Sequence, residues 1–258
     1  CLYIFTYKLL FNYLVQSKKQ TNNQINYTET SGVVSVSKTF LSGVFMWMTM
    51  ALSITALVSW TFASNPSLMS ILINSETGSM SAIGWVVMFA PLGLVLLMGM
   101  RFQKMSASSM LLVFIVYSIL MGMSLSFIFL VYSLPSIAKT FVITAGMFGF
   151  MAIVGYTTKT DLTKFGKIMM MGLVGIIIAS VVNFFTQSAR MDYVISFIGV
   201  MVFTGLTAYD VQKLKRLGAG IGTESEMARK ATIFGALTLY LDFINLFLFL
   251  LRFFGDRK

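Results

Sequence analysis

The sequence contains no histidine and a single cysteine, Cys1, among its 258 residues. One cysteine can form neither an internal disulfide nor a cysteine metal cluster, and without histidine the usual zinc ligand sets cannot be assembled. The absence of histidine also means that proton sensing near neutral pH must use a carboxyl group with a shifted pKa. A phosphate-cradling glycine loop is missing too, so the sequence indicates no nucleotide-driven pump.

Charged residues are scarce as well, at 11% of the chain, whereas soluble domains usually carry ~25%. Hydrophobic residues make up 57%, and the mean hydropathy is +0.84. Seven long apolar runs favour membrane-spanning helices over a barrel, whose strands would be short and alternating. They lie near 40–63, 79–100, 108–133, 137–157, 168–186, 193–212 and 231–254. The sequence therefore predicts an all-α integral membrane protein with one seven-helix transmembrane domain at 40–258. We expect residues 1–39 to form a cytoplasmic, poorly ordered tail.

The net charge of +10 does not indicate nucleic-acid binding, because the basic residues lie in the gaps between the apolar runs. There they are explained by membrane orientation and by lipid headgroups. The basic residues of the N-terminal segment and of the second, fourth and sixth gaps are Lys8, Lys18, Lys19, Lys38, Arg101, Lys104, Lys159, Lys164, Lys167, Lys213, Lys215, Arg216, Arg229 and Lys230. The opposite gaps hold only Lys139 and Arg190, and Arg252, Arg257 and Lys258 follow near the end. This asymmetry predicts a cytoplasmic N-terminus. Seven spans would place the basic C-terminal end outside the cytoplasm, against the positive-inside rule. A seventh run that re-enters the membrane without crossing it is therefore the alternative to a spanning one.

An aspartate, Asp242, lies near the middle of the last apolar run. A carboxylate at that depth costs at least ~2.5 kcal/mol, so it requires a partner, a proton or water. On a helix Asp242 shares one face with Gly235, Thr238, Asn245 and Arg252, while leucine, phenylalanine and isoleucine occupy the other faces. We therefore expect this helix to turn a polar side to the bundle interior and an apolar side to lipid.

Asp210, at the end of the sixth run, is the only other acidic residue in the predicted spans. If the last two helices pack antiparallel, Asp210 lies near the cytoplasmic end and Asp242 somewhat deeper. Two carboxylates close together in a low dielectric cannot both ionise cheaply, so such a pair can take up or release a proton near neutral pH. Each aspartate alone is also explained as a buried acid bonded to a backbone group or a lysine. Arg101, which closes the second run, is explained equally by an interfacial anchor or by a charge partner of Asp210.

Small residues share helix faces in two further runs, and in lipid such residues let backbones approach each other. We expect packing faces at Gly172, Gly175, Ala179 and Asn183, and at Gly146 and Gly149.

Two intramembrane aspartates also suggest an intramembrane aspartyl protease, and Tyr209-Asp210 matches the tyrosine-aspartate pair of those enzymes. Their next helix carries glycine-x-glycine-aspartate, however, where this chain has Leu239-Tyr240-Leu241-Asp242. Their proline-alanine-leucine motif is missing too, since the last proline is Pro135. We therefore expect no enzymatic activity.

The segments around both aspartates resemble the Bax inhibitor family, the transmembrane Bax inhibitor motif proteins. The resemblance lies in GLTAYDVQKLK at 205–215, LYLDFINLFLFLLRFFG at 239–255, GMSLS at 122–126 and a basic residue closing the second span. It covers roughly residues 40–258 and points to a bacterial member. It implies seven helices with the seventh near the centre of the bundle, and a pH-sensitive calcium leak gated by an aspartate pair, which would be Asp210 and Asp242. Arg101 matches the arginine that pairs with the sixth-helix aspartate in bacterial relatives.

These observations lead to one main functional hypothesis and one alternative. The main hypothesis is a calcium-permeable leak channel in a bacterial inner membrane, with Asp210 and Asp242 as pH sensor, gate and transient calcium ligands. Arg101 would be the charge partner, and Thr238 and Asn245 would line the pore. The alternative is a non-conducting membrane partner that modulates a membrane protease or a quality-control machine. We expect no cofactor in either case, and no partner beyond the lipid bilayer and other membrane proteins.

Overall fold

A computed structural model describes residues 30–74, 78–221 and 225–258 of the chain. Within these residues the secondary structure is helical, apart from two isolated bridges. The helices are α2 (Thr30–Ser64), α3 (Pro66–Leu72), α4 (Ala82–Met100), α5 (Ala107–Leu125), α6 (Ile128–Val131), α7 (Leu134–Thr157), α8 (Thr163–Thr186), α9 (Ala189–Ala219) and α10 (Glu226–Phe254). The first of them begins within the segment that the sequence predicts as a tail, and most of that tail lies outside the described residues.

Seven of the described segments are long and apolar enough to cross a membrane, as the sequence predicts. They are Ser37–Ser64, Ala82–Met100, Ala107–Val131, Leu134–Thr157, Thr163–Thr186, Ala189–Ala219 and Glu226–Phe254. The third span combines α5 and the short helix α6, and α3 lies in the connection between the first two spans. The protein is therefore an all-α integral membrane bundle.

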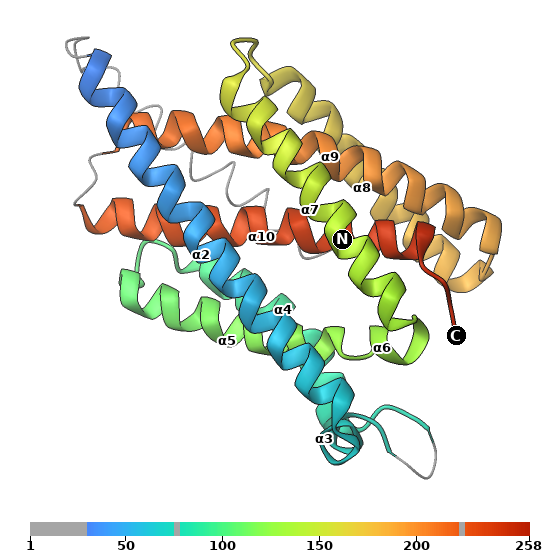
Figure 1. The fold of residues 1–258 in the computed structure, drawn as a ribbon. Coiled ribbons are helices and arrows are strands. Elements are labelled where there is room, and N and C mark those ends of the chain that lie inside the picture. Colours follow the sequence, from blue (N-terminus) through green and yellow to red (C-terminus); the bar gives the residue numbers. More distant parts are fainter. Residues whose placement is uncertain (1–29, 75–77, 222–224) are drawn as a thin grey trace.

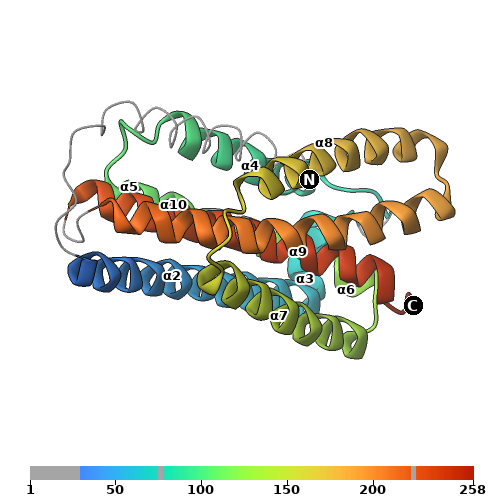
Figure 2. The ribbon, with the colours of Figure 1, turned by 90° about the horizontal axis from the view of Figure 1, so that it is seen from above.

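Helix α10 runs through the centre of this bundle. Figures 1 and 2 show it with other helices on all sides, and it contacts α2, α5, α7 and α9. Of its most apolar stretch, 94% is buried inside the protein. The expectation of a lipid-facing side on this helix is therefore wrong, because its leucine, isoleucine and phenylalanine side chains pack against neighbouring helices. The central position implied by the family resemblance is confirmed.

Helix α8 lies at the opposite extreme, at the edge of the bundle (Figure 2). Only 11% of its apolar stretch is buried, and it packs mainly on α9. Phe184 and Phe185 near its end are among the most exposed large side chains in the described part of the chain. In a membrane, this outer surface faces lipid or another transmembrane protein.

Close helix approaches occur at glycines, but not at all of the predicted ones. A β-carbon at Gly172 would lie 2.9 Å from Val202, so that glycine does pack. Gly146, Gly149 and Gly175 have open space around them, so the expectation of packing faces there is wrong. The tightest approach in the bundle's interior is instead at Gly155, where α7 meets the main chain of Ala208 in α9.

Candidate functional site

Asp210 and Asp242 are both buried in the centre of the bundle, with exposed fractions of 1% and 0%. Asp210 belongs to α9 and Asp242 to α10, and these two helices pack against each other. The prediction that both acids lie inside the transmembrane domain is confirmed, because both fall within candidate spans.

The register of α9 and α10 can be followed through an aromatic pair. The rings of Phe203 and Phe249 stack with centroids 5.6 Å apart. Asp210 lies about two turns after Phe203, and Asp242 lies about two turns before Phe249. Because the helices are antiparallel, both steps run in the same direction along the shared interface. The register therefore brings the two aspartates to facing levels of α9 and α10, about 10 Å along the axis from the aromatic pair.

A second contact brackets the aspartates from the other side. A β-carbon at Gly235 of α10 would lie 2.8 Å from Leu214 of α9. Leu214 lies about one turn beyond Asp210, and Gly235 about two turns before Asp242. The acids are thus held in a closely packed segment between the phenylalanine stack and the leucine–glycine contact.

Other polar side chains near the aspartates hydrogen-bond to their own helices. Thr238 Oγ1 donates to the Phe234 carbonyl at 3.0 Å, and Asn245 Nδ2 donates to the Leu241 carbonyl at 2.8 Å. Both side chains are buried. In this conformation their donors are directed to the backbone of α10, and the pore-lining role of the two residues stays a prediction.

Arg101, the predicted charge partner, is the C-cap residue of α4. It is exposed, in contrast to the buried Asp210. The pairing between these two residues stays a prediction. The turn that follows Arg101 and the start of α5 are nevertheless attached to α10: Lys230 Nζ donates to the Gln103 carbonyl at 3.4 Å, and Glu226 Oε1 accepts a hydrogen bond of 2.7 Å from the Ala107 amide.

A buried polar network on the opposite side of α10 is not anticipated from the sequence. Thr55 of α2 donates its hydroxyl hydrogen to the Ser118 carbonyl of α5 at 2.9 Å. The Tyr240 hydroxyl lies 2.7 Å from Thr55 Oγ1. Since Thr55 has only one hydroxyl hydrogen, Tyr240 must be the donor in the second bond. This chain of bonds joins α2, α5 and α10 two residues before Asp242. Polar residues in the middle of the first and third apolar runs are the only sequence feature that points to it.

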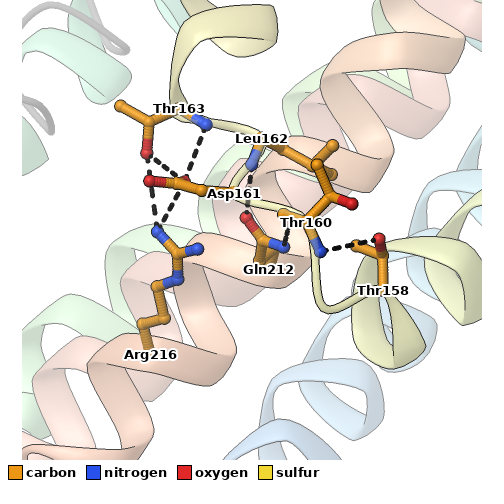
Figure 3. A network of polar contacts seen from close by, with 7 residues as sticks. All are labelled: Thr158, Thr160, Asp161, Leu162, Thr163, Gln212 and Arg216. Atoms are coloured by element: carbon orange, nitrogen blue, oxygen red, sulfur yellow. Dashed lines mark hydrogen bonds and ion pairs between the residues drawn. The ribbon is translucent and has the colours of Figure 1, made fainter.

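The connection between α7 and α8 is tied to α9 through Gln212 and Arg216 (Figure 3), and Gln212 is two residues after Asp210 in the chain. The buried Gln212 accepts a bond of 2.9 Å from the Leu162 amide and donates one of 2.8 Å to the Thr160 carbonyl. One turn further on, Arg216 pairs with Asp161 at 2.8 Å. Hydrogen bonds from the side chain and amide of Thr163, with a further contribution from Arg216, lower the Asp161 pKa to about 2.

An open cavity of about 550 Å³ lies at the other end of α8, α9 and α10. Asp192 lines it and pairs with Arg252 at 3.2 Å and with Arg257 at 3.6 Å. Phe249 also lines this cavity, so the phenylalanine stack separates it from the aspartates. The polar face expected to run along α10 thus divides into two parts: Arg252 belongs to the cavity, and Asp242 belongs to the packed interior.

Comparison with known proteins identifies the family. The model of the family described as "Inhibitor of apoptosis-promoting Bax1" matches residues 37–258. The chain belongs to this family. It is 49% identical to the inner membrane protein YbhL of Escherichia coli over 222 residues, which are 86% of this chain and 93% of YbhL. An uncharacterized protein of Rickettsia prowazekii is 42% identical over 91% of this chain and 99% of its own length. An uncharacterized membrane protein of Streptococcus pyogenes is 33% identical over 91% of this chain and 98% of its own.

The range matched by the Bax inhibitor family model, 37–258, includes both aspartates and all seven candidate spans. Within the described residues, no group of three or more histidine, cysteine, aspartate or glutamate side chains could hold a metal ion. Calcium takes six to eight oxygen ligands, so two carboxylates alone do not complete a calcium site.

Proposed function

We propose that this member of the Bax inhibitor family is a pH-sensitive calcium-permeable leak channel, with Asp210 and Asp242 as its gate. The observation that carries the proposal is the burial of these two acids at facing levels of α9 and α10 within candidate membrane spans. Two carboxylates in such an environment share a proton more cheaply than they carry two charges. Protonation therefore favours the closely packed helix pair, and loss of the proton favours its separation.

The observed conformation fits the closed state of such a channel. Helix α10 is enclosed on all sides, and Thr238 and Asn245 donate to its backbone. Neither the cavity at Asp192 nor a second cavity between α2 and α7 is lined by Asp242, Thr238 or Asn245. On deprotonation, repulsion between the carboxylates would separate α9 from α10. The side-chain oxygens of Thr238 and Asn245 would then join the carboxylates as ligands for a passing calcium ion.

A non-conducting role is the second candidate, and the exposed apolar surface of α8 offers a place for a partner to pack. This helix lies at the edge of the bundle, so it can pack against a transmembrane helix of another protein without rearrangement of the core. The partner would be a membrane protease or a quality-control machine whose activity the protein modulates. For both candidates we propose a bacterial inner-membrane location with the N-terminus in the cytoplasm, no enzymatic activity and no cofactor.

Calcium flux into liposomes that contain purified protein, measured across pH, tests the channel. Asp210→Asn and Asp242→Asn preserve the shape of the protonated acid but cannot titrate. Each should flatten the pH response, and the double variant should differ little from either single variant because the pair acts as one unit. Asp256→Asn, at the exposed end of the chain after α10, is the matched control and should leave the response unchanged.

Three outcomes contradict this proposal. A pH response that survives in the double variant would place the sensor elsewhere. Additive effects of the two substitutions would show two separate sites. Absence of flux from folded wild-type protein at every pH would exclude conduction and favour the non-conducting role.

A further inference from the structure

A groove between α2 and α7 forms a second cavity, of about 250 Å³. Its lining residues are Lys38, Leu41, Phe45, Ala152, Ile153 and Tyr156. Five of these six side chains are largely apolar, and the one charged group, the Lys38 ammonium, belongs to an exposed residue. The groove is therefore an apolar slot with a single positive charge.

A second lysine, Lys215 of α9, contacts one of the lining residues, Tyr156. Lys215 Nζ donates to the Tyr156 carbonyl at 2.7 Å and lies 4.7 Å from the centroid of the Tyr156 ring. The Lys215 carbonyl accepts a hydrogen bond of 3.0 Å from Ser37 Oγ of α2. Lys215 thus bridges α2 and α7 beside the groove, with its ammonium engaged by both the carbonyl and the ring of Tyr156.

The groove lies where the spans meet the membrane surface. Lys38 is in the first turn of the span Ser37–Ser64, and Tyr156 is in the last turn of Leu134–Thr157. A groove at this depth between two outer helices is open to lipid rather than to a soluble ligand. An acyl chain can cover Leu41, Phe45 and Ile153, while the headgroup stays level with the lysines.

The positive charge of Lys38 favours a lipid with an anionic headgroup. Within the described residues, the Lys38 side chain forms no ion pair or hydrogen bond. The acid in the nearby α7–α8 connection, Asp161, is already paired with Arg216. Lys38 is therefore available to an anion, and Lys215, held on Tyr156, adds a second positive charge nearby.

We propose that the groove is a binding site for one anionic glycerophospholipid of the leaflet at the lysine-rich end of the bundle. Its phosphate binds Lys38 beside Lys215, and the first part of one acyl chain lies between α2 and α7. The bound lipid would hold these two helices against α9 close to Gln212 and Asp210. This site does not depend on whether the protein conducts ions.

Native mass spectrometry of the purified protein with dioleoyl phosphatidylglycerol tests the site. Dioleoyl phosphatidylcholine, which has the same acyl chains and no net charge, is the reference lipid. The wild-type protein should retain phosphatidylglycerol in preference to phosphatidylcholine. Lys38→Gln should weaken that retention about fivefold, the change expected from one lysine near an anionic surface. Ala152→Leu should block the groove and remove the preference, and Ile153→Phe serves the same purpose if Ala152→Leu does not fold.

Two lysines provide matched controls. Lys167 is exposed on α8 at the same end of the bundle but outside the groove, and Lys139 is exposed at the other end of α7. Lys167→Gln and Lys139→Gln should leave retention unchanged. Equal losses in Lys38→Gln and Lys167→Gln would show diffuse surface attraction and overturn the proposal. Unchanged retention in Lys38→Gln, or equal retention of the two lipids by wild type, would overturn it as well.

Discussion

Gly155 of α7 lies against the main chain of Ala208 in α9, so closely that a β-carbon at position 155 would overlap the Ala208 carbonyl. Ala208 is two residues before Asp210, so this contact positions α7 beside the proposed gate. Main-chain atoms cannot move aside as a flexible side chain can, and α7 must shift if any other residue stands at position 155.

Gly155→Ala should therefore destabilise the protein, by about 1–3 kcal/mol, the usual cost of overpacking. Thermal or denaturant unfolding in a fixed detergent measures the change. Gly149→Ala on the same helix is the control: its β-carbon meets nothing within 4 Å, and alanine is the better helix former by up to ~1 kcal/mol. Equal effects of the two substitutions would contradict a close α7–α9 contact at Gly155.

The Tyr240–Thr55 network predicts that Thr55→Val destabilises the protein more than Tyr240→Phe does. Tyr240→Phe removes a hydroxyl that only donates to Thr55, and should cost about 1 kcal/mol. Thr55→Val leaves both the Tyr240 hydroxyl and the Ser118 carbonyl without this partner inside the bundle, and should cost about 1–3 kcal/mol. The double variant should be less destabilised than the sum of the two, because both substitutions remove one shared bond. Strict additivity in the unfolding free energies would contradict the network.

The α7–α8 connection should respond to acid through Asp161. Its pKa is lowered from 3.8 to about 2, so the folded state favours the ionised carboxylate. The stabilising contribution is fully present above pH 3.8 and is lost as the pH falls towards 2. Carbon-13 NMR titration of the Asp161 carboxyl in micelles measures the pKa directly. Thr163→Val should raise this pKa more than Arg216→Gln does, because the Thr163 hydroxyl is the largest cause of the shift. The reverse order would show that the ion pair dominates.

The sequence predicts the local features of this structure well, and its tertiary packing only in part. Seven apolar runs predict seven spans because length and hydropathy are local properties. The same residues could not show that α10 is enclosed, because leucine and phenylalanine suit lipid and a protein interior equally well. The expected packing at Gly146 and Gly149 fails for a related reason: a glycine does not reveal which neighbour it faces.

The candidate site is likewise only partly visible in the sequence. Asp210 and Asp242 stand out because acids inside apolar runs are rare. The network of Tyr240, Thr55 and Ser118 joins residues far apart in the chain, and each of them alone is an ordinary polar residue in a span. The two hydrogen bonds of Gln212 to the α7–α8 connection also depend on tertiary contacts that no local sequence pattern encodes.

The orientation predicted from the basic residues can be tested by cysteine labelling. Ser70 of α3 and Lys104 after α4 are both exposed and lie at opposite ends of α4. In a Cys1→Ser background, Ser70→Cys should react with a membrane-impermeant thiol reagent added to intact cells, and Lys104→Cys should react only after lysis. Labelling of Lys104→Cys but not Ser70→Cys in intact cells would reverse the orientation, and labelling of both would contradict the span count between them.

The closed state could depend on a pair between Arg101 and Asp210, or on the proton shared by Asp210 and Asp242 alone, and substitution of Arg101 distinguishes the two. In the observed conformation its side chain is exposed at the end of α4, next to contacts that Glu226 and Lys230 make with the α4–α5 connection. A pair with the buried Asp210 therefore requires the Arg101 side chain to turn inwards, in a closed state that differs locally from the observed one. If it pairs with Asp210 and favours closure, Arg101→Ala should raise basal calcium leak about fivefold, as expected for the loss of ~1 kcal/mol of closed-state stabilisation. Arg101→Lys should restore closure only in part, because lysine keeps the charge but loses the bidentate contact.

Lys104→Ala, in the same turn, is the control for a general loss of positive charge and should leave the leak unchanged. The leak is measured in liposomes at a pH where wild type is closed, together with the melting temperature of each variant. If Arg101→Ala changes neither quantity, Arg101 is an interfacial anchor. Closure would then depend on the proton shared by Asp210 and Asp242, without a contribution from Arg101.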